Sequence, residues 1–330
     1  MMMSLAPTAT TDDSVESATS DLQLRVTALI WESPEVLSVH LRSLDGSDLP
    51  QWDPGAHIDI TFENDMQRQY SLTGDPADSS SWRLTVAHST GSRGASRHVH
   101  TELRPGAIVR ASAPRNNFSL IDAPGYVLIG GGIGVTPLLT FARTLQQRGA
   151  DWRLDLATRG PEHVPLRRDL EQFGDRVHIY AANRGQRLSL AEIIDQAPAG
   201  YALYCCGPER MLDEFDELCA AREISAHRER FAAQELSAPI RSGAFTVTCA
   251  RSGREIVVEP EVSVLTALES AGLPVTSSCL EGVCGTCEVA VLAGIVDHRD
   301  SILTADERDA NDTMMTCVSR ALSDNLELDL

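Results

Sequence analysis

Four of the eight cysteines have a spacing that could hold an iron–sulfur cluster. Cys279, Cys284 and Cys287 form a C-x4-C-x2-C run, and Cys317 follows further along the chain. This is the spacing of plant-type 2Fe–2S sites, in which each iron takes two thiolates besides the bridging sulfides. The alternatives are a zinc site, which usually combines two close cysteine pairs, or buried free thiols. The single close pair favours the cluster and makes these four cysteines the predicted metal ligands.

Two glycine-rich segments indicate contact with a nucleotide. Gly130–Pro137 follows a short apolar run and precedes a helical pattern, although Val135 breaks the dinucleotide fingerprint. Thr136 and Pro137 suit the N-cap and the first position of that helix, where free N–H groups could meet a phosphate. Cys206–Pro208 ends another predicted strand, at the edge where open α/β sheets bind ligands. A purely structural glycine-rich turn is the alternative.

A third segment, Arg68–Leu72, combines an anion-binding arginine with an aromatic ring and a hydroxyl group. In a strand, Arg68 and Tyr70 share a face, which suits a ligand that has both a phosphate and a flat ring. Gly91–Ser96 precedes a helical stretch and could cradle a phosphate. An exposed strand and a plain loop are the alternative interpretations of these two segments.

The elements that must position these segments fall into three parts. Between residues 22 and 121, apolar and polar residues alternate over short stretches separated by turn residues, which predicts an antiparallel barrel of about six strands. The strand candidates are Leu37–Leu41, His57–Phe62, Trp82–His88 and Ile108–Ala111.

From Gly125 onward, short apolar strands alternate with helical patterns, which predicts a parallel, doubly wound sheet. The strand candidates are Tyr126–Ile129, Arg153–Ala157, Val177–Ala181 and Ala202–Cys205, and the helix candidates are Pro137–Gln147 and Pro208–Arg222. The pattern changes again beyond residue 231. There, Phe245–Thr248 and Glu255–Val258 flank a turn and predict a hairpin, and Ser263 could cap a helix that ends near Gly272.

Taken together, these motifs resemble the phthalate dioxygenase reductase family, which includes the vanillate demethylase reductases. The resemblance covers the chain after about residue 21, and it extends to Pro114–Phe118 and to the order of the three parts. It implies an FMN-binding β-barrel over residues 21–122, a nicotinamide-nucleotide α/β domain over 123–235 and a β-grasp, plant-type ferredoxin domain over 236–330. Residues 1–20 are expected to be a disordered tail.

The resemblance also implies the residues that bind the cofactors. Arg68 would meet the FMN phosphate, Tyr70 would lie along the ribityl chain and ring, and Ser71 would lie near flavin N5. Phe231 would cover the flavin ring. The complete predicted cofactor-binding set is Arg68, Tyr70, Ser71, Ala87, His88, Gly94, Ala95, Ser96, Gly132, Gly134, Thr136, Cys206, Gly207, Pro208 and Phe231. No catalytic acid or base is predicted, because hydride and electron transfer need orientation more than proton transfer.

The resemblance further implies NADH as the donor and a Rieske-type oxygenase or demethylase as the partner that receives the electrons. One alternative is a reductase for a haem-thiolate monooxygenase. Another is a flavin reductase whose C-terminal part is a zinc-stabilised interaction module. Arg159, just beyond a predicted strand, could favour the 2′-phosphate of NADPH, whereas the family favours NADH.

Charge and composition exclude several other classes of function. The 330 residues carry 28 Lys+Arg against 47 Asp+Glu, a formal net charge of −19, which argues against a nucleic-acid or anionic-membrane partner. All the basic residues are arginine, so no lysine is available for Schiff-base chemistry or a P-loop. No run reaches the roughly 20 apolar residues of a membrane span, and the N-terminal segment lacks a signal-peptide pattern. We therefore expect a cytoplasmic protein with reduced cysteines.

Overall fold

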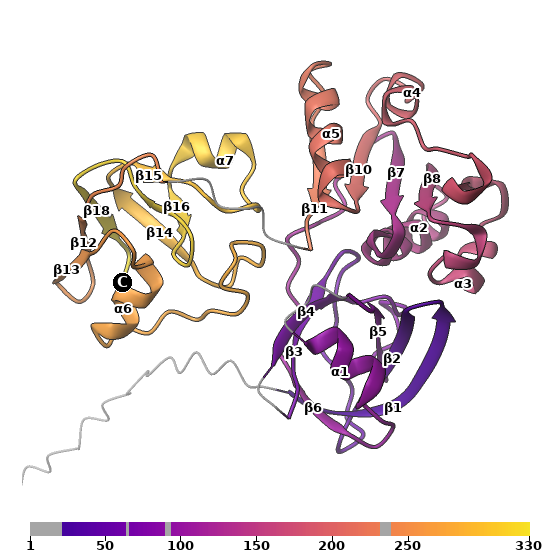
Figure 1. Ribbon diagram of the computed structural model, residues 1–330, viewed down its shortest axis with the longest axis horizontal. Helices are drawn as coiled ribbons and strands as arrows, with labels where there is room; N and C mark the ends of the chain where they lie inside the picture. The colour runs from indigo at the N-terminus through magenta and orange to yellow at the C-terminus, as the bar shows by residue number, and fades with distance from the viewer. Residues whose placement is uncertain (1–21, 64–65, 90–93, 232–238) are drawn as a thin grey trace, which may run out of the picture.

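The computed structural model describes residues 22–63, 66–89, 94–231 and 239–330, which form three larger sheets and one two-stranded sheet (Figure 1). The expected tail at residues 1–20 and the junction at 232–238 lie outside the described residues. The three sheets correspond to the predicted barrel, the parallel α/β sheet and the C-terminal ferredoxin fold.

The first sheet is antiparallel and has six strands in the order β4-β3-β6-β1-β2-β5. A bridge between Leu72 and Leu84 brings the end of β4 against β5 and closes the sheet into a barrel. Inward residues such as Trp82, Leu24 and Ile58 are fully buried, as the alternating pattern requires. The elements are β1 (Leu22–Ser33), β2 (Val36–Ser43), β3 (His57–Thr61), β4 (Gln67–Ser71), β5 (Trp82–Ala87), α1 (Ala95–Thr101) and β6 (Ile108–Ala111).

The second sheet has five parallel strands in the order β11-β10-β7-β8-β9. The chain order reverses between β7 and β10, so the carboxyl ends of these two strands border the crevice where such sheets bind ligands. The strands are β7 (Gly125–Gly131), β8 (Asp151–Thr158), β9 (Val177–Ala181), β10 (Ala202–Cys206) and β11 (Ala226–Glu229), and the helices are α2 (Val135–Gln147), α3 (Arg167–Glu171), α4 (Leu190–Asp195) and α5 (Glu209–Ala220).

The third sheet mixes antiparallel and parallel pairs in the order β13-β12-β18-β14-β16. The predicted hairpin forms, and the Ser263 hydroxyl accepts a hydrogen bond from Thr266 N at the start of α6. The elements are β12 (Phe245–Cys249), β13 (Arg254–Val258), α6 (Val264–Ser270), β14 (Glu288–Ala293), β15 (Val296–Asp297), α7 (Ala305–Ala310), β16 (Thr313–Met315), β17 (Arg320–Ala321) and β18 (Asn325–Leu328).

One local prediction is wrong. Thr136 does not cap α2, because a 3-10 turn at Gly132–Gly134 precedes the helix and Gly134 occupies the N-cap. The Thr136 hydroxyl instead donates to Ile133 O at 2.9 Å inside this turn. Over the described parts of the chain, no helix combines the length and the apolar character needed to cross a membrane.

Candidate functional site

The four predicted cysteine ligands come together at one end of the third sheet. Cys279, Cys284 and Cys287 lie on the loop between α6 and β14, and Cys317 lies between β16 and β17. The Cys279 thiol contacts those of Cys284 and Cys317, and Cys287 also contacts Cys317. Because these thiols share hydrogen bonds, the pKa of Cys279 is lowered and the pKa of Cys317 is raised.

The backbone of this cysteine loop (residues 279–287) curls tightly around the thiols. Leu280, Gly282 and Gly285 all adopt positive φ angles, of 59°, 71° and 73°. The amide of Glu281 donates to Cys279 Sγ at 3.3 Å, and the amide of Thr286 donates to Cys284 Sγ at 3.5 Å. Amides aimed at sulfur are the second-shell contacts that stabilise and tune iron–sulfur centres.

The donor set fits a 2Fe–2S cluster. The Cys279 thiol contacts those of Cys284 and Cys317, and Cys287 contacts Cys317, so all four thiols lie together. Such a cluster takes two thiolates for each iron besides its bridging sulfides, which is the number of thiols present here.

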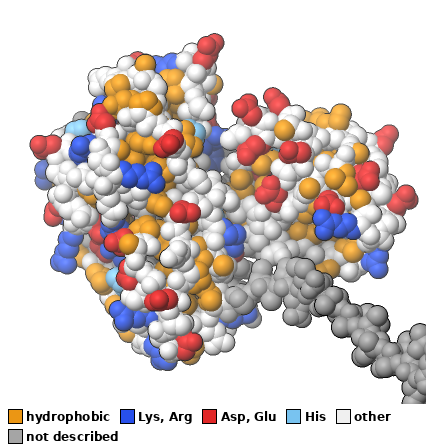
Figure 2. Space-filling view, turned by 180° about the vertical axis from the view of Figure 1, so that it is seen from behind, with side chains coloured by type: hydrophobic (Ala, Val, Ile, Leu, Met, Phe, Trp, Pro, Cys, Tyr) orange, Lys and Arg blue, Asp and Glu red, His pale blue; other side chains and the backbone are white. Residues whose placement is uncertain are grey.

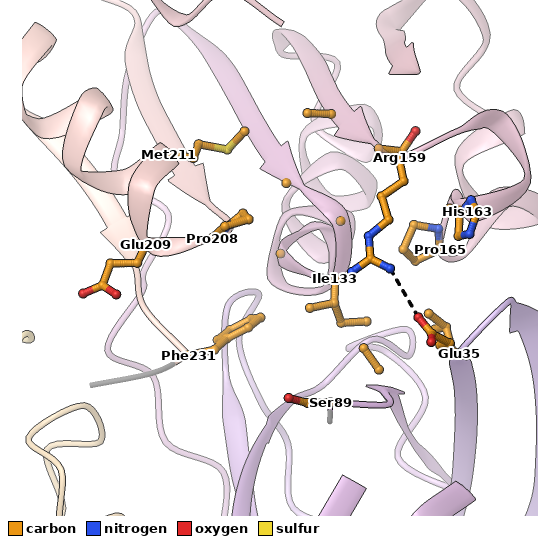
Figure 3. A pocket seen from close by; sticks show the side chains of 18 of the residues that line it. Glu35, Ser89, Ile133, Arg159, His163, Pro165, Pro208, Glu209, Met211 and Phe231 are labelled. Atoms are coloured by element: carbon orange, nitrogen blue, oxygen red, sulfur yellow. Dashed lines mark hydrogen bonds and ion pairs between the residues drawn. The ribbon is translucent and has the colours of Figure 1, made fainter. Parts of the chain in front are cut away.

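The second candidate site is a cavity of about 670 Å³ between the barrel and the parallel sheet (Figure 3). Its walls are the loops after β7 and β10, the turn between β1 and β2, the end of β5 and the segment after β11. Figure 3 shows Phe231 and Ile133 projecting toward the same space as Pro208. A cavity of this size is suited to part of a nucleotide cofactor.

Glycines allow the loops after β7 and β10 to pack so closely that their backbones are in contact. A Cβ atom on Gly131 would lie 2.5 Å from Pro208 Cδ, and one on Gly207 would lie 3.1 Å from Gly131 Cα. A Cβ atom on Gly134 would overlap Cys206 O. The cradle thus requires glycine at these positions, and Gly132, with φ at 54°, faces open space beside it.

Several predicted cofactor residues line this cavity and others lie behind it. Thr136 and Cys206 are buried and are not part of the cavity wall. The predicted residues on the wall are Ala87, His88, Gly132, Gly134, Gly207, Pro208 and Phe231.

The remaining predicted residues lie on the barrel. Arg68, Tyr70 and Ser71 are on β4, and burial raises the pKa of Tyr70 to about 12. At the start of α1, Gly94 has φ at 107°, and its Cβ position would lie 3.2 Å from Met66 Sδ, just before β4. These contacts bring the start of α1 and the start of β4 together.

The first residues of α1 also contact the segment that follows β5. The Ser96 hydroxyl accepts from Ser89 N at 3.2 Å, and Ala95 is buried beside it. The structure therefore brings the start of α1, which includes Ala95 and Ser96, against the segment that follows Ala87 and His88.

Sequence reasoning missed a buried pair where the barrel meets the parallel sheet. His57 Nδ1 of β3 lies 4.0 Å from Glu229 Oε1 of β11. Burial raises the pKa of Glu229 to about 8. Burial and Arg115 lower the pKa of His57 to about 4, whereas the charges of Asp59 and Cys279 act in the opposite direction. The predicted segment around Phe231 contains Glu229, but no local pattern reveals its distant partner.

The cysteine loop is held against the barrel domain through Asn117. Its side-chain Nδ2 donates to Cys284 O at 2.9 Å. A Cβ atom on Gly285 would lie 2.9 Å from the same nitrogen, so glycine is needed for this approach. On the barrel, Arg115 pairs through its backbone with His57, which in turn lies opposite Ser71. The cysteine loop and the predicted flavin residues thus share one region of the molecule.

Comparisons with known proteins agree with this geometry. Residues 247–322, which contain all four cysteines, match the 2Fe-2S iron-sulfur cluster binding domain family. The chain is 40% identical over 320 residues to phenoxybenzoate dioxygenase subunit beta of Ectopseudomonas oleovorans, which covers 96% of this chain and 100% of that protein.

Two solved structures extend the comparison. The structure of phthalate dioxygenase reductase, described as modular and as passing electrons from pyridine nucleotides to [2Fe-2S], is 31% identical. It has a TM-score of 0.66 and covers 94% of this chain and 98% of its own. An intact type IV self-sufficient cytochrome P450 monooxygenase is 39% identical with a TM-score of 0.88. The match covers 94% of this chain but 41% of the P450 chain.

The barrel, the nucleotide cavity and the cysteine cluster define the class of flavin- and iron–sulfur-dependent reductases. Within that class, the chain belongs to the phthalate dioxygenase reductase-like family. It is an oxidoreductase that transfers electrons from a nicotinamide nucleotide through a flavin to a 2Fe–2S cluster. The predicted fold class, the flavin and the 2Fe–2S cluster are confirmed, and the zinc-module alternative is wrong because the four cysteines lie in a cluster-binding family match.

Proposed function

We propose that the chain is the NADH-dependent reductase of a Rieske-type oxygenase or demethylase. The observation that carries the proposal is the 40% identity to phenoxybenzoate dioxygenase subunit beta over 96% of this chain. The hydrogen bond from Asn117 to Cys284 O joins the cysteine loop to the same barrel domain that borders the nucleotide cavity. One flavin on this barrel would then lie between the nucleotide and the cluster. When bound, the flavin takes two electrons from the nicotinamide as a hydride and passes them singly to the cluster.

We propose FMN as that flavin. Its phosphate would lie between the Arg68 guanidinium and the backbone amides from Gly94 to Ser96. Support comes from the contact of Gly94 with Met66, which brings the two segments together. Tyr70 and Ser71 would hold the ribityl chain and the ring edge, with Ala87 and His88 along the same pocket.

For the nucleotide, we propose that Gly132, Gly134, Gly207 and Pro208 cradle the dinucleotide backbone and that Phe231 covers the flavin ring. Phe231 is 45% exposed and points into the cavity, so its ring is free to stack on a flat ligand. Thr136 and Cys206 support this cradle from behind, because both are buried beneath its loops. With the expected domain limits, residues 21–122 would form the flavin domain, 123–235 the nucleotide domain and 236–330 the cluster domain.

We propose that the partner docks on the ferredoxin domain through charge. Residues 241–330 carry 6 arginines against 15 acidic residues, and Figure 2 shows acidic side chains scattered over this part of the surface. A basic patch on the oxygenase would complement them, and the association would weaken as salt rises. None of the eight cysteines forms a disulfide, which is consistent with the reducing cytoplasm as the location.

Reconstitution tests the proposed partner. The reductase, supplied with NADH without air, is mixed with a purified Rieske-type oxygenase from the same genome. We expect the Rieske absorption to bleach at a rate that falls with rising salt. A rate that does not depend on salt contradicts the charged docking surface. Failure to reduce any Rieske protein of that genome contradicts the proposed acceptor.

One observation favours a second acceptor, a haem-thiolate monooxygenase. The self-sufficient P450 that matches this chain carries a homologous reductase unit within the same polypeptide as its haem domain. The same experiment with a P450 of that genome distinguishes the two, because the ferrous–CO band forms only if the haem receives electrons.

A further inference from the structure

An ion pair crosses the cavity between two domains. Arg159 Nη1 lies 3.4 Å from Glu35 Oε2, and both residues line the cavity wall (Figure 3). Arg159 follows β8 of the parallel sheet, whereas Glu35 lies in the turn between β1 and β2 of the barrel. Their side chains are 81% and 55% exposed, so this pair contributes little to the stability of the fold.

The backbone around both residues is well defined. Glu35 has φ at 62°, and its carbonyl accepts a hydrogen bond from His88 N at 2.7 Å. The Arg159 carbonyl accepts from Asn183 N at 2.9 Å. Hydrogen bonds of the backbone therefore hold both residues in place at the cavity wall.

The position of Arg159 matters for nucleotide selectivity. In doubly wound sheets, the end of the strand beside the glycine-rich strand is where the adenine ribose is read. A carboxylate there accepts from the 2′-hydroxyl of NADH, whereas an arginine favours the 2′-phosphate of NADPH. Here β8 lies directly beside the glycine-rich strand β7. The residue that follows β8 is Arg159, which is already paired with Glu35 of the barrel domain.

Other charged groups near this end of the cavity are already engaged or lie elsewhere. His163 Nδ1 contacts Glu162 Oε1 at 3.0 Å within the same loop. Glu209, at the start of α5, is on the opposite wall, as Figure 3 shows. Glu35 is thus the carboxylate whose charge acts most directly on the Arg159 guanidinium.

We propose that Glu35 selects NADH over NADPH by neutralising Arg159, so that the guanidinium no longer favours a 2′-phosphate at the adenosine end of the cavity. The selectivity is therefore shared between two domains, because the carboxylate comes from the flavin barrel and the arginine comes from the nucleotide sheet. This inference rests on the proposed binding of the nucleotide in the cavity.

The test compares kcat/KM for NADPH and NADH in the complete reductase, with ferricyanide as the electron acceptor. The variants are Glu35→Gln, Arg159→Gln and the double variant, with Asp195→Asn as the control. Asp195 pairs with Arg222 on the same nucleotide domain and does not line the cavity. Glu35→Gln is expected to raise the NADPH-to-NADH ratio by roughly fivefold, which is the effect of one unit charge at about 4 Å in water.

The outcomes are separable. In the Arg159→Gln background, the effect of Glu35→Gln should shrink markedly, because the carboxylate acts mainly through the guanidinium. A ratio that stays at the wild-type value in Glu35→Gln overturns the inference, as does an equal rise in Asp195→Asn. If the wild-type reductase fails to oxidise NADH at all, the proposed function fails, and that result is distinct from an unchanged ratio.

Discussion

The two interfaces of the barrel domain are built differently. Toward the nucleotide sheet, Arg83 of β5 and Arg143 of α2 both pair with Asp169 of α3, and all three side chains are 15–17% exposed. Arg143 also donates to the carbonyls of Thr73 and Gly74. A nearly buried charge network with backbone partners holds these two domains as one unit.

Toward the ferredoxin domain, the barrel uses a neutral contact. Asn117 donates one amide hydrogen bond to Cys284 O, and glycine at position 285 lets the chains approach. A neutral hydrogen bond of this kind contributes about 1 kcal/mol, whereas removing one partner from a buried charge network costs about 3 to 5 kcal/mol. The difference suits the chemistry, because hydride transfer needs fixed geometry whereas the cluster must meet both the flavin and an external protein.

The largest expected effect comes from removing a cluster ligand. In Cys317→Ser, iron and acid-labile sulfide should be lost and NADH-driven reduction of cytochrome c should fall to background. Reduction of ferricyanide by the flavin should continue, because the barrel and nucleotide domains do not depend on the cluster.

The matched control is Cys249→Ala, a buried cysteine of the same domain on β12. It should keep its iron and its cytochrome c activity. Full cluster content in Cys317→Ser would show that the four-cysteine assignment is wrong.

The second largest effect is expected on the stability of the charged interface between the barrel and the nucleotide domain. Asp169→Ala leaves Arg83 and Arg143 without their carboxylate, so the unfolding of the barrel and nucleotide unit should be easier by roughly 3 kcal/mol. Chemical denaturation followed by flavin fluorescence measures this change. Asp195→Asn breaks an exposed pair and should unfold as the wild type does. If the two variants have the same free energy of unfolding, the charge network at Asp169 does not stabilise the interface, and the two interfaces of the barrel do not differ in strength.

The buried Glu229 gives a pH-dependent test of the same unit. Its pKa of about 8 in the folded protein exceeds the unfolded value of 4.5, so the folded state holds an extra proton and stability falls as pH rises through this range. His57 acts oppositely between pH 4 and 6.5, because its folded pKa is lowered. Of these two residues, only Glu229 contributes to the pH dependence above pH 6.5.

Glu229→Gln should therefore flatten the decline in stability between pH 6.5 and 8, a change of roughly 1 to 2 kcal/mol. Thermal unfolding midpoints at several pH values measure it. Glu259→Gln, on an exposed turn of the ferredoxin domain, is the control. A decline that persists unchanged in Glu229→Gln would assign the pH dependence to other groups.

The smallest effect is expected at the neutral interface. Asn117→Ala removes one hydrogen bond, worth about 1 kcal/mol, so cytochrome c reduction should slow by roughly fivefold while ferricyanide reduction stays constant. Asn325→Ala, in which the lost side chain accepts a hydrogen bond from Thr248 within the ferredoxin domain, is the control. A parallel fall in both activities would place the effect of Asn117 on the flavin itself and not on the interface.

Local sequence patterns predicted the elements and the cluster ligands well. Strand β9 and strand β6 match their predicted ranges, and the hairpin after residue 245 forms as expected. Three of the cysteines converge because the C-x4-C-x2-C spacing is a geometric constraint on one loop, whereas Cys317 is brought to them by the fold, from between β16 and β17.

Contacts between distant segments could not be predicted in this way. The His57–Glu229 pair and the Asn117–Cys284 hydrogen bond join residues from different domains, so no periodicity in the chain encodes them. The capping role expected for Thr136 failed for a related reason. The turn at Gly132–Gly134 is tightened by packing against Cys206 and Gly207, which the local sequence does not reveal.

The visible absorption spectrum of the purified protein, recorded without air before and after NADH is added, tests the central claim most directly. The account predicts flavin bands superimposed on a broad iron–sulfur envelope, and it predicts that NADH bleaches both. Bleaching of the flavin with an unchanged iron–sulfur envelope would contradict the internal electron path. A flavin spectrum with no iron–sulfur envelope would contradict the cluster itself.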